Sequence, residues 1–110
     1  MNGDTENTVE YSKSRFWRRK DEENGIVVIG LTDSGIEELG DLSELELPSE
    51  GTEVEKNEAV GRAEGSYSEF EVIVPISGTV CGVNEEAVKN LTMVMEDPLE
   101  EGWLLKIQAE

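Results

Sequence analysis

The chain has 110 residues, of which 9 are basic and 26 are acidic, so its formal net charge is −17 at pH 7. A chain of this length forms one domain with a modest core and has no room for a second, catalytic domain. The acidic charge argues against nucleic acid as a partner, because phosphates would be repelled. It suits an acidic protein that docks on basic surfaces of larger partners.

The sequence lacks targeting signals and the usual metal ligands. The first ten residues, MNGDTENTVE, hold no apolar run of the signal-peptide kind, and no stretch reaches membrane-spanning length. Cys81 is alone and there is no histidine, which excludes an intrachain disulfide and removes the usual ligands of zinc and copper. We therefore expect a cytoplasmic monomer with no membrane contact and no metal site.

The N-terminal part predicts a tail followed by strands. Residues 1–10 are polar and are expected to be a flexible tail, with one folded domain over residues 11–110. The segment KSRFWRRK carries five of the nine basic residues and is expected to form an edge strand, since Lys and Arg protect exposed sheet edges. Asn24-Gly25 then predicts a hairpin before the β-rich run of Ile26–Leu31.

A helical pattern follows. Thr32, Asp33 and Ser34 can each cap a helix. Ser34 with Glu37 fits a capping box, and Gly40 can end the helix. The leucines of DLSELELP do not share one period-2 face, which predicts a β-bulge or a bend in the next strand.

Two apolar, strand-like stretches, EAVGRAE and EVIVPISGTV, flank the segment EGSYSEF. Small polar residues dominate this segment, so a hairpin should turn there. Its exposed tip would carry one large ring, Tyr67, beside Glu64, Gly65, Ser66 and Ser68.

The last third predicts one more helix and a closing strand. Asn84 can cap a short helical pattern, and Pro98 lies in a turn-rich linker. GWLLKIQ predicts a strand that packs on the sheet following Asn24-Gly25. Around this strand the core is expected to include Trp103, Leu104, Ile107 and Ile29. Trp17 is expected in the core or at its rim.

These elements predict a mainly β chain, a β-sandwich or flattened barrel of short antiparallel strands with two or three short helices. No βαβ alternation indicates a nucleotide-binding fold. The paired carboxylates lie in polar, turn-like stretches and are interpreted as solvated surface. No histidine is present to activate a Ser or Cys nucleophile, and Cys81 is interpreted as a structural strand residue. We therefore expect no catalytic residue and no enzyme.

Four stretches together resemble one family: GIVVIGLTDSGIEELGDL, ELPSEGTEV, PISGTVCGVNE and EDPLEEGWLLKI. They are similar to the H protein of the glycine cleavage system, the lipoyl-carrying β-sandwich of glycine catabolism. The resemblance runs from about Tyr11 to Ile107. It implies a lipoyl-domain-like fold and a carrier that itself catalyses nothing.

In that family a lysine at the hairpin tip carries lipoate in amide linkage. Counting back eight residues from Pro75, the proline of the family's Pro-x-Ser-Gly, puts Tyr67 at the lysine position. The family's tip resembles Glu-Ser-Val-Lys-Ala. Here Glu64 is kept, and the positions that differ are Gly65, Ser66, Tyr67 and Ser68.

Tyrosine cannot replace the lysine chemically, because its phenol, with a pKa near 10, would give an ester instead of an amide. A shift in register does not rescue the site, since residues 57–75 contain no lysine. The resemblance therefore implies a degenerate lipoylation site, and no cofactor is expected.

Three functions stay open. The favoured one is a non-lipoylated, H-like binding, scaffold or regulatory partner of glycine-cleavage or lipoate-handling enzymes. The second is a genuine carrier of the aminomethyl group of glycine with an unrecognised attachment residue. The third is a carrier of another group on the hydroxyls of Tyr67, Ser66 or Ser68.

Overall fold

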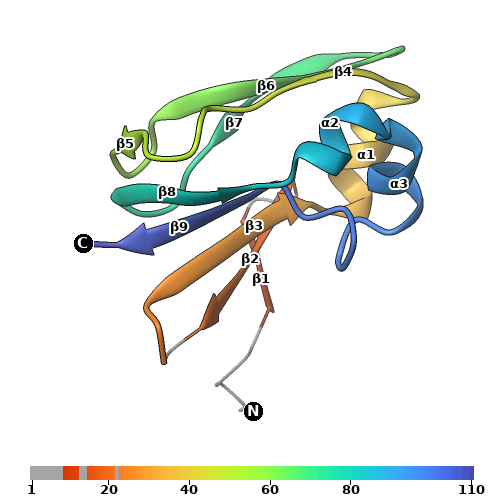
Figure 1. The fold of residues 1–110 in the computed structure, drawn as a ribbon. Helices are drawn as coiled ribbons and strands as arrows, with labels where there is room; N and C mark the ends of the chain where they lie inside the picture. The colour runs from red at the N-terminus through yellow and green to blue at the C-terminus, as the bar shows by residue number, and fades with distance from the viewer. Residues whose placement is uncertain (1–8, 13–14, 22) are drawn as a thin grey trace.

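Two antiparallel β-sheets face each other, and three short helices cover one end of the pair (Figure 1). The computed structural model describes residues 9–12, 15–21 and 23–110. In this part of the chain the elements are β1 (Val9–Ser12), β2 (Phe16–Asp21), β3 (Ile26–Leu31), α1 (Asp33–Leu39), β4 (Leu42–Glu46), β5 (Glu53–Val54), β6 (Ala59–Gly65), β7 (Glu69–Ile73), β8 (Gly78–Val83), α2 (Glu85–Lys89), α3 (Leu91–Glu96) and β9 (Leu105–Ala109). Among the described helices, none has the length and apolar character needed to cross a membrane.

The larger sheet has the strand order β1-β2-β3-β9-β8-β5, and the smaller has the order β4-β6-β7. This confirms the predicted β-sandwich of short antiparallel strands. The predicted irregularity in β4 is confirmed as a register shift between Leu42 and Glu44. The closing strand β9 pairs with β3, also as predicted, with Val27 opposite Ile107.

The β2–β3 hairpin turns at Asn24-Gly25, where Gly25 adopts a φ of +68°. The side-chain amide of Gln108 donates to the carbonyl of Asn24 at 2.7 Å, which ties this turn to β9.

The basic segment does not form the sheet edge, so that prediction was wrong. β2 lies between β1 and β3, because β1 pairs along its whole length with β2. β1 begins at Val9, two residues inside the expected tail, whereas residues 1–8 and Lys13 lie outside the described residues. The guanidinium of Arg19 lies 5.1 Å from the ring centre of Trp17, so part of the positive charge is used within the sheet.

Helix α1 is capped by Thr32, one of the three predicted cap residues, and the Ser34–Glu37 box does not form its start. The Thr32 hydroxyl accepts from the backbone N–H of Gly35 at 3.0 Å. The Thr32 N–H donates to the carbonyl of Arg15. Thr32 is the only residue between the end of β3 and the start of α1. Gly40 ends the helix as predicted, with a φ of +82°.

Asn84 caps α2 as predicted, and it also holds the linker that leads to β9. Its side-chain oxygen accepts from the N–H of Ala87 at 3.3 Å. Its amide nitrogen donates to the carbonyls of Glu101 at 2.8 Å and Trp103 at 2.7 Å. The third helix, α3, follows directly in a stretch where the sequence analysis placed no element.

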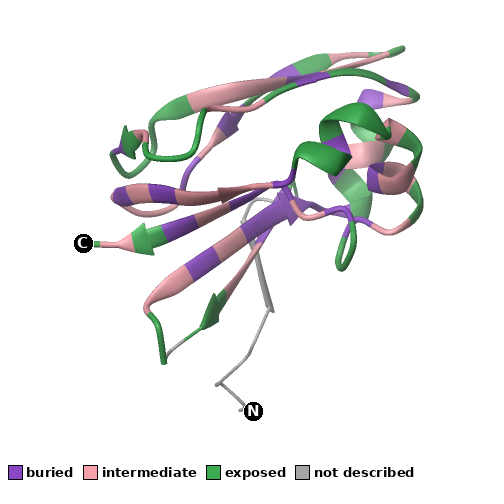
Figure 2. Ribbon diagram, viewed as in Figure 1, coloured by how far each residue is buried: buried purple, intermediate pink, exposed green. Residues whose placement is uncertain are grey.

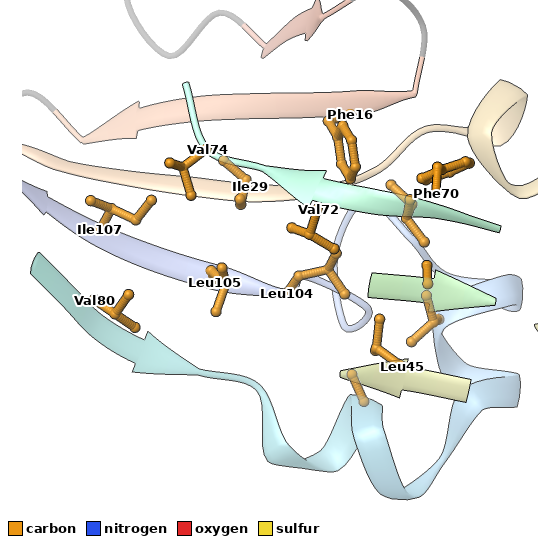
Figure 3. Close-up of a cluster of buried hydrophobic side chains, with 14 of the residues drawn as sticks. Phe16, Ile29, Leu45, Phe70, Val72, Val74, Val80, Leu104, Leu105 and Ile107 are labelled. Carbon is orange, nitrogen blue, oxygen red and sulfur yellow. The ribbon is translucent and has the colours of Figure 1, made fainter. Parts of the chain in front are cut away.

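The core lies between the two sheets, where inward-facing side chains meet (Figure 3). Burial alternates clearly along β7 and β9 (Figure 2). Trp17 is completely buried, and its indole N–H donates to the carbonyl of Pro98 at 3.1 Å. Gly30 makes room for it, because a Cβ there would lie 2.5 Å from the indole ring. The predicted core positions Ile29, Leu104 and Ile107 are confirmed.

Trp103 is only partly buried, so its predicted place in the core was wrong. The ammonium of Lys106 lies 4.8 Å from its ring centre. Trp103 precedes β9 and lies at the rim of the sandwich, where Lys106 covers one face of the ring.

Candidate functional site: the β6–β7 hairpin tip

The segment singled out in the sequence forms the turn between β6 and β7. Gly65 donates its N–H to the carbonyl of Ser68 at 2.9 Å, which leaves Ser66 and Tyr67 as the two loop residues. Neither loop residue has a positive φ. The turn is therefore not one of the primed types that match strand twist in two-residue hairpins. Its conformation must be supported by contacts from outside the hairpin.

Those contacts come from the connection between α1 and β4. Tyr67 donates its N–H to the carbonyl of Leu39 at 2.8 Å, and Ser66 donates to the carbonyl of Asp41 at 2.9 Å. In return, the N–H of Asp41 donates to the hydroxyl of Ser66 at 3.0 Å. Three hydrogen bonds thus fix both loop residues to the end of α1, where carbonyls lack helical partners.

Two glycines allow this close approach. A Cβ on Gly65 would lie 2.3 Å from the carbonyl oxygen of Leu39, inside van der Waals contact. A Cβ on Gly40 would lie 2.5 Å from the Ser66 hydroxyl oxygen and 2.8 Å from a ring carbon of Tyr67. The positive φ of Gly40 favours glycine as well. Glycine at position 65 therefore lets the tip lie directly against the end of α1.

Tyr67 itself extends into solvent. Its side chain is 80% exposed, the largest value among the described large hydrophobic residues. The ring atoms Cγ and Cδ2 lie beside Gly40, and the backbone of Tyr67 is fixed by its hydrogen bond to Leu39. The site therefore presents an exposed phenol on a fixed backbone, a group that can donate and accept hydrogen bonds and offer an apolar face.

The remaining predicted tip residues have distinct surroundings. Glu64 precedes the turn, and its carboxylate lies 3.1 Å from the guanidinium of Arg62. The Arg62 group also contacts three further glutamates, which the sequence analysis did not single out: Glu44, Glu46 and Glu69. The hydrogen bond with Glu64 is the main cause of a raised pKa at Arg62. Ser68 is half-buried and accepts through its carbonyl only from Gly65.

A second cation lies near the same end of α1. Arg15 makes two hydrogen bonds to the carboxylate of Glu38, at 2.6 and 3.0 Å. Its guanidinium carbon lies 4.5 Å from the ring centre of Phe70 in β7. The hydrogen bond to Glu38 is the main cause of a raised pKa at Arg15. This pairing was not predictable from the sequence, because 23 positions separate the two residues.

No described lysine lies at the tip. Lys56 precedes β6 and therefore lies beyond its opposite end, roughly 20 Å from the turn at about 3.3 Å per residue. Lys89 ends α2 and lines a depression with Leu47 and Pro48, beyond the end of β4 that is remote from the tip. Lys106 stacks on Trp103 in the other sheet. The lipoyl group of the resembled family thus finds no amine at this turn, and the residues present do not fit it.

The described part of the chain shows no other arrangement of side chains that would form a metal or catalytic site. No group of three or more metal-ligating side chains occurs there. Cys81 lies on β8 as a free, half-buried thiol. The described carboxylate pairs Glu37/Glu38, Glu85/Glu86 and Glu100/Glu101 are exposed, in agreement with their interpretation as surface.

Comparisons with known proteins agree with the fold. A family model described as glycine cleavage H-protein matches residues 9–110. The chain is 39% identical over 102 residues to the glycine cleavage system H protein of Legionella pneumophila (strain Corby), covering 93% of this chain and 80% of the relative. It is 35% identical over 102 residues to the probable glycine cleavage system H protein of Aeropyrum pernix, with 93% and 70% covered. The crystal structure of a glycine cleavage system H protein from Mycobacterium marinum superimposes with a TM-score of 0.86 at 30% identity, covering 94% of this chain and 84% of that one.

Proposed function

Since the chain belongs to the glycine cleavage H-protein family, whose members are carrier proteins and not catalysts, we propose that it is a member that acts without lipoate, by binding. Its partners are glycine-cleavage or lipoate-handling enzymes, and it serves them as a scaffold or regulatory protein. We place this monomeric protein in the cytoplasm.

One observation supports the proposal: a tyrosine lies at the β6–β7 tip, the position to which the family resemblance assigns the lipoyl lysine. Lipoate attachment needs a primary amine, which a phenol does not supply. The nearest lysines in sequence, Lys56 and Lys89, lie away from the turn. The fold of the carrier is retained while the attachment chemistry is replaced by an anchored aromatic side chain, a residue type enriched among the strongest contacts of protein interfaces.

A second candidate is a carrier of a different group on Tyr67. The exposure of this side chain favours it over the neighbouring hydroxyls, because Ser66 is engaged with Asp41 and Ser68 is half-buried. The two candidates differ in mass: a binding protein has the mass of its sequence, and a carrier has an adduct.

The test combines intact mass with a lipoylation reaction. Protein isolated from its native cell should have the unmodified mass. Incubation with a lipoate ligase, lipoate and ATP should leave wild-type mass unchanged. A lipoyl adduct on any residue of the wild-type chain would reinstate the carrier, and a different adduct on Tyr67 would establish the second candidate.

Tyr67→Lys is the matched control variant in this reaction. It restores the amine on the same backbone, and we expect partial lipoylation because Gly65, Ser66 and Ser68 also differ from the family pattern. Binding is then measured with purified glycine-cleavage enzymes and lipoate ligase of the source organism, each titrated against the unmodified protein. Failure of all of them to bind would contradict the proposed role.

A further inference from the structure

The outer surface of the three-stranded sheet carries a concentration of charge. We call it the acidic face, and it consists of Glu44, Glu46, Arg62, Glu64, Glu69 and Glu71. These side chains alternate along the strands with buried neighbours such as Leu45, Ala63 and Phe70, so they point away from the core. The face thus sets five carboxylates against one guanidinium.

Arg62 is the only cation of the acidic face, and its guanidinium group already contacts four of the five carboxylates. It lies 2.5 Å from Glu69, 3.1 Å from Glu64, 3.4 Å from Glu44 and 3.7 Å from Glu46. Glu71 lies directly opposite Arg62 in the ladder, yet within the described residues no ion pair reaches its carboxylate. Like charges on neighbouring strands repel, and one guanidinium leaves most of this charge uncompensated.

Tyr67 lies at the end of the same hairpin. Glu64 and Glu69 face each other in the last pair of the β6–β7 ladder before the turn, and Gly65 to Ser68 close it. Tyr67 therefore lies at the tip end of the acidic face, with its ring beside Gly40 and its backbone held by the carbonyl of Leu39. The ring is an observation independent of the charges, and it indicates a protein partner because tyrosine is enriched among the strongest contacts of protein interfaces.

We propose that the acidic face and Tyr67 form one docking surface for a protein that presents lysine and arginine side chains beside an apolar pocket for a phenol ring. This inference rests on the proposed binding function and identifies the partner by its surface. The net charge of −17 opposes a second copy as occupant. The same sign repels nucleic acid and anionic lipid surfaces.

The acidic face and Tyr67 affect different steps of binding. Exposed charges steer the encounter, so they set the association rate and its dependence on salt. A ring that fills a pocket is released only when the complex opens, so it sets the dissociation rate. Rate measurements can therefore separate the two contributions.

The experiment measures association and dissociation rates with whichever purified enzyme binds the protein in the titrations described under Proposed function. The test variant Glu44→Gln/Glu46→Gln/Glu71→Gln removes three charges from the acidic face and leaves Arg62 with Glu64 and Glu69. The matched control, Glu23→Gln/Glu50→Gln/Glu53→Gln, removes three exposed charges elsewhere. Glutamine keeps the shape of glutamate, and equal melting temperatures check that both variants fold.

At about 50 mM salt, the test variant should lower the association rate constant at least about fivefold, and the control less than about twofold. The difference should largely vanish at about 1 M salt, where the Debye length is about 3 Å. Tyr67→Ala should instead raise the dissociation rate. Equal effects of the two triple variants, or no effect of either, would overturn this inference while the binding function stands. Self-association of the wild type that the test variant abolishes would also overturn it, in favour of a second copy. Absence of any binding by the wild type would overturn both proposals.

Discussion

The contact between Gly65 and helix α1 makes a quantitative prediction for Gly65→Ala. The new Cβ would lie 2.3 Å from the Leu39 carbonyl oxygen and 2.7 Å from its carbon. Both atoms belong to the backbone, so they cannot turn aside as a flexible side chain does. The tip must therefore move away from α1.

The cost follows from what this movement breaks. The three hydrogen bonds of Ser66 and Tyr67 to Leu39 and Asp41 would lengthen or be lost. Each contributes about 0.5–1.5 kcal/mol, but water can replace part of this at an exposed turn. We expect the free energy of unfolding to fall by about 2 kcal/mol, which is also typical of overpacking.

Urea denaturation measures this change. With a slope of about 1–3 kcal/mol per molar urea, the midpoint should fall by about 1 M. Gly82→Ala is the matched control, since the nearest atoms to its Cβ would be side-chain carbons of Lys106, at 3.3–3.4 Å, and not backbone. Its free energy of unfolding should stay within about 0.5 kcal/mol of the wild-type value. Amide hydrogen exchange gives a local reading: the N–H groups of Ser66 and Tyr67 should lose protection in Gly65→Ala. Equal midpoints for the two variants, with protection intact at the tip, would refute the close approach of the hairpin to α1.

Tyr67→Ala should change the free energy of unfolding by less than about 0.5 kcal/mol, because the ring is exposed, yet weaken partner binding by more than about 1 kcal/mol if the ring is an anchor; calorimetric titration beside a denaturation curve checks both. Trp17→Ala should cost about 3–5 kcal/mol, whereas Trp103→Ala should cost clearly less, since only Trp17 is fully buried; similar midpoints for the two variants would contradict this difference. Asn84→Ala should cost about 2–3 kcal/mol, because it removes the cap of α2 and leaves two carbonyls without their donor; thermal unfolding that matches the wild type would show that water replaces the amide.

The sequence predicted well those features that depend on local chemistry. Asn24-Gly25, Gly40 and the Asn84 cap require particular backbone conformations, and each forms the expected turn or helix end. The position of Tyr67 at a hairpin tip was also predictable, because small polar residues separate two strand-like stretches.

Features that depend on distant contacts were not predictable in the same way. The cap at Thr32 is selected by its hydrogen bond to Arg15, and the rim position of Trp103 depends on where β9 begins. The basic residues of β2 predicted an edge strand, but β1 pairs with β2 on that side. The need for glycine at Gly65 is set by Leu39, a residue on another element.

The position of β9 in the larger sheet has a consequence for how the protein is made. The strand lies between β3 and β8, so it joins the N-terminal strands to the rest of the sheet, although it is synthesised after both. Until it emerges from the ribosome, the apolar edge of β3 has no partner on that side and is open to pairing with other chains. Folding must then close a contact between nearly opposite ends of the described chain, which is a slow step for β-proteins. A nascent chain stalled before β9 should therefore aggregate or be held by chaperones, even though most of its strands have already been made.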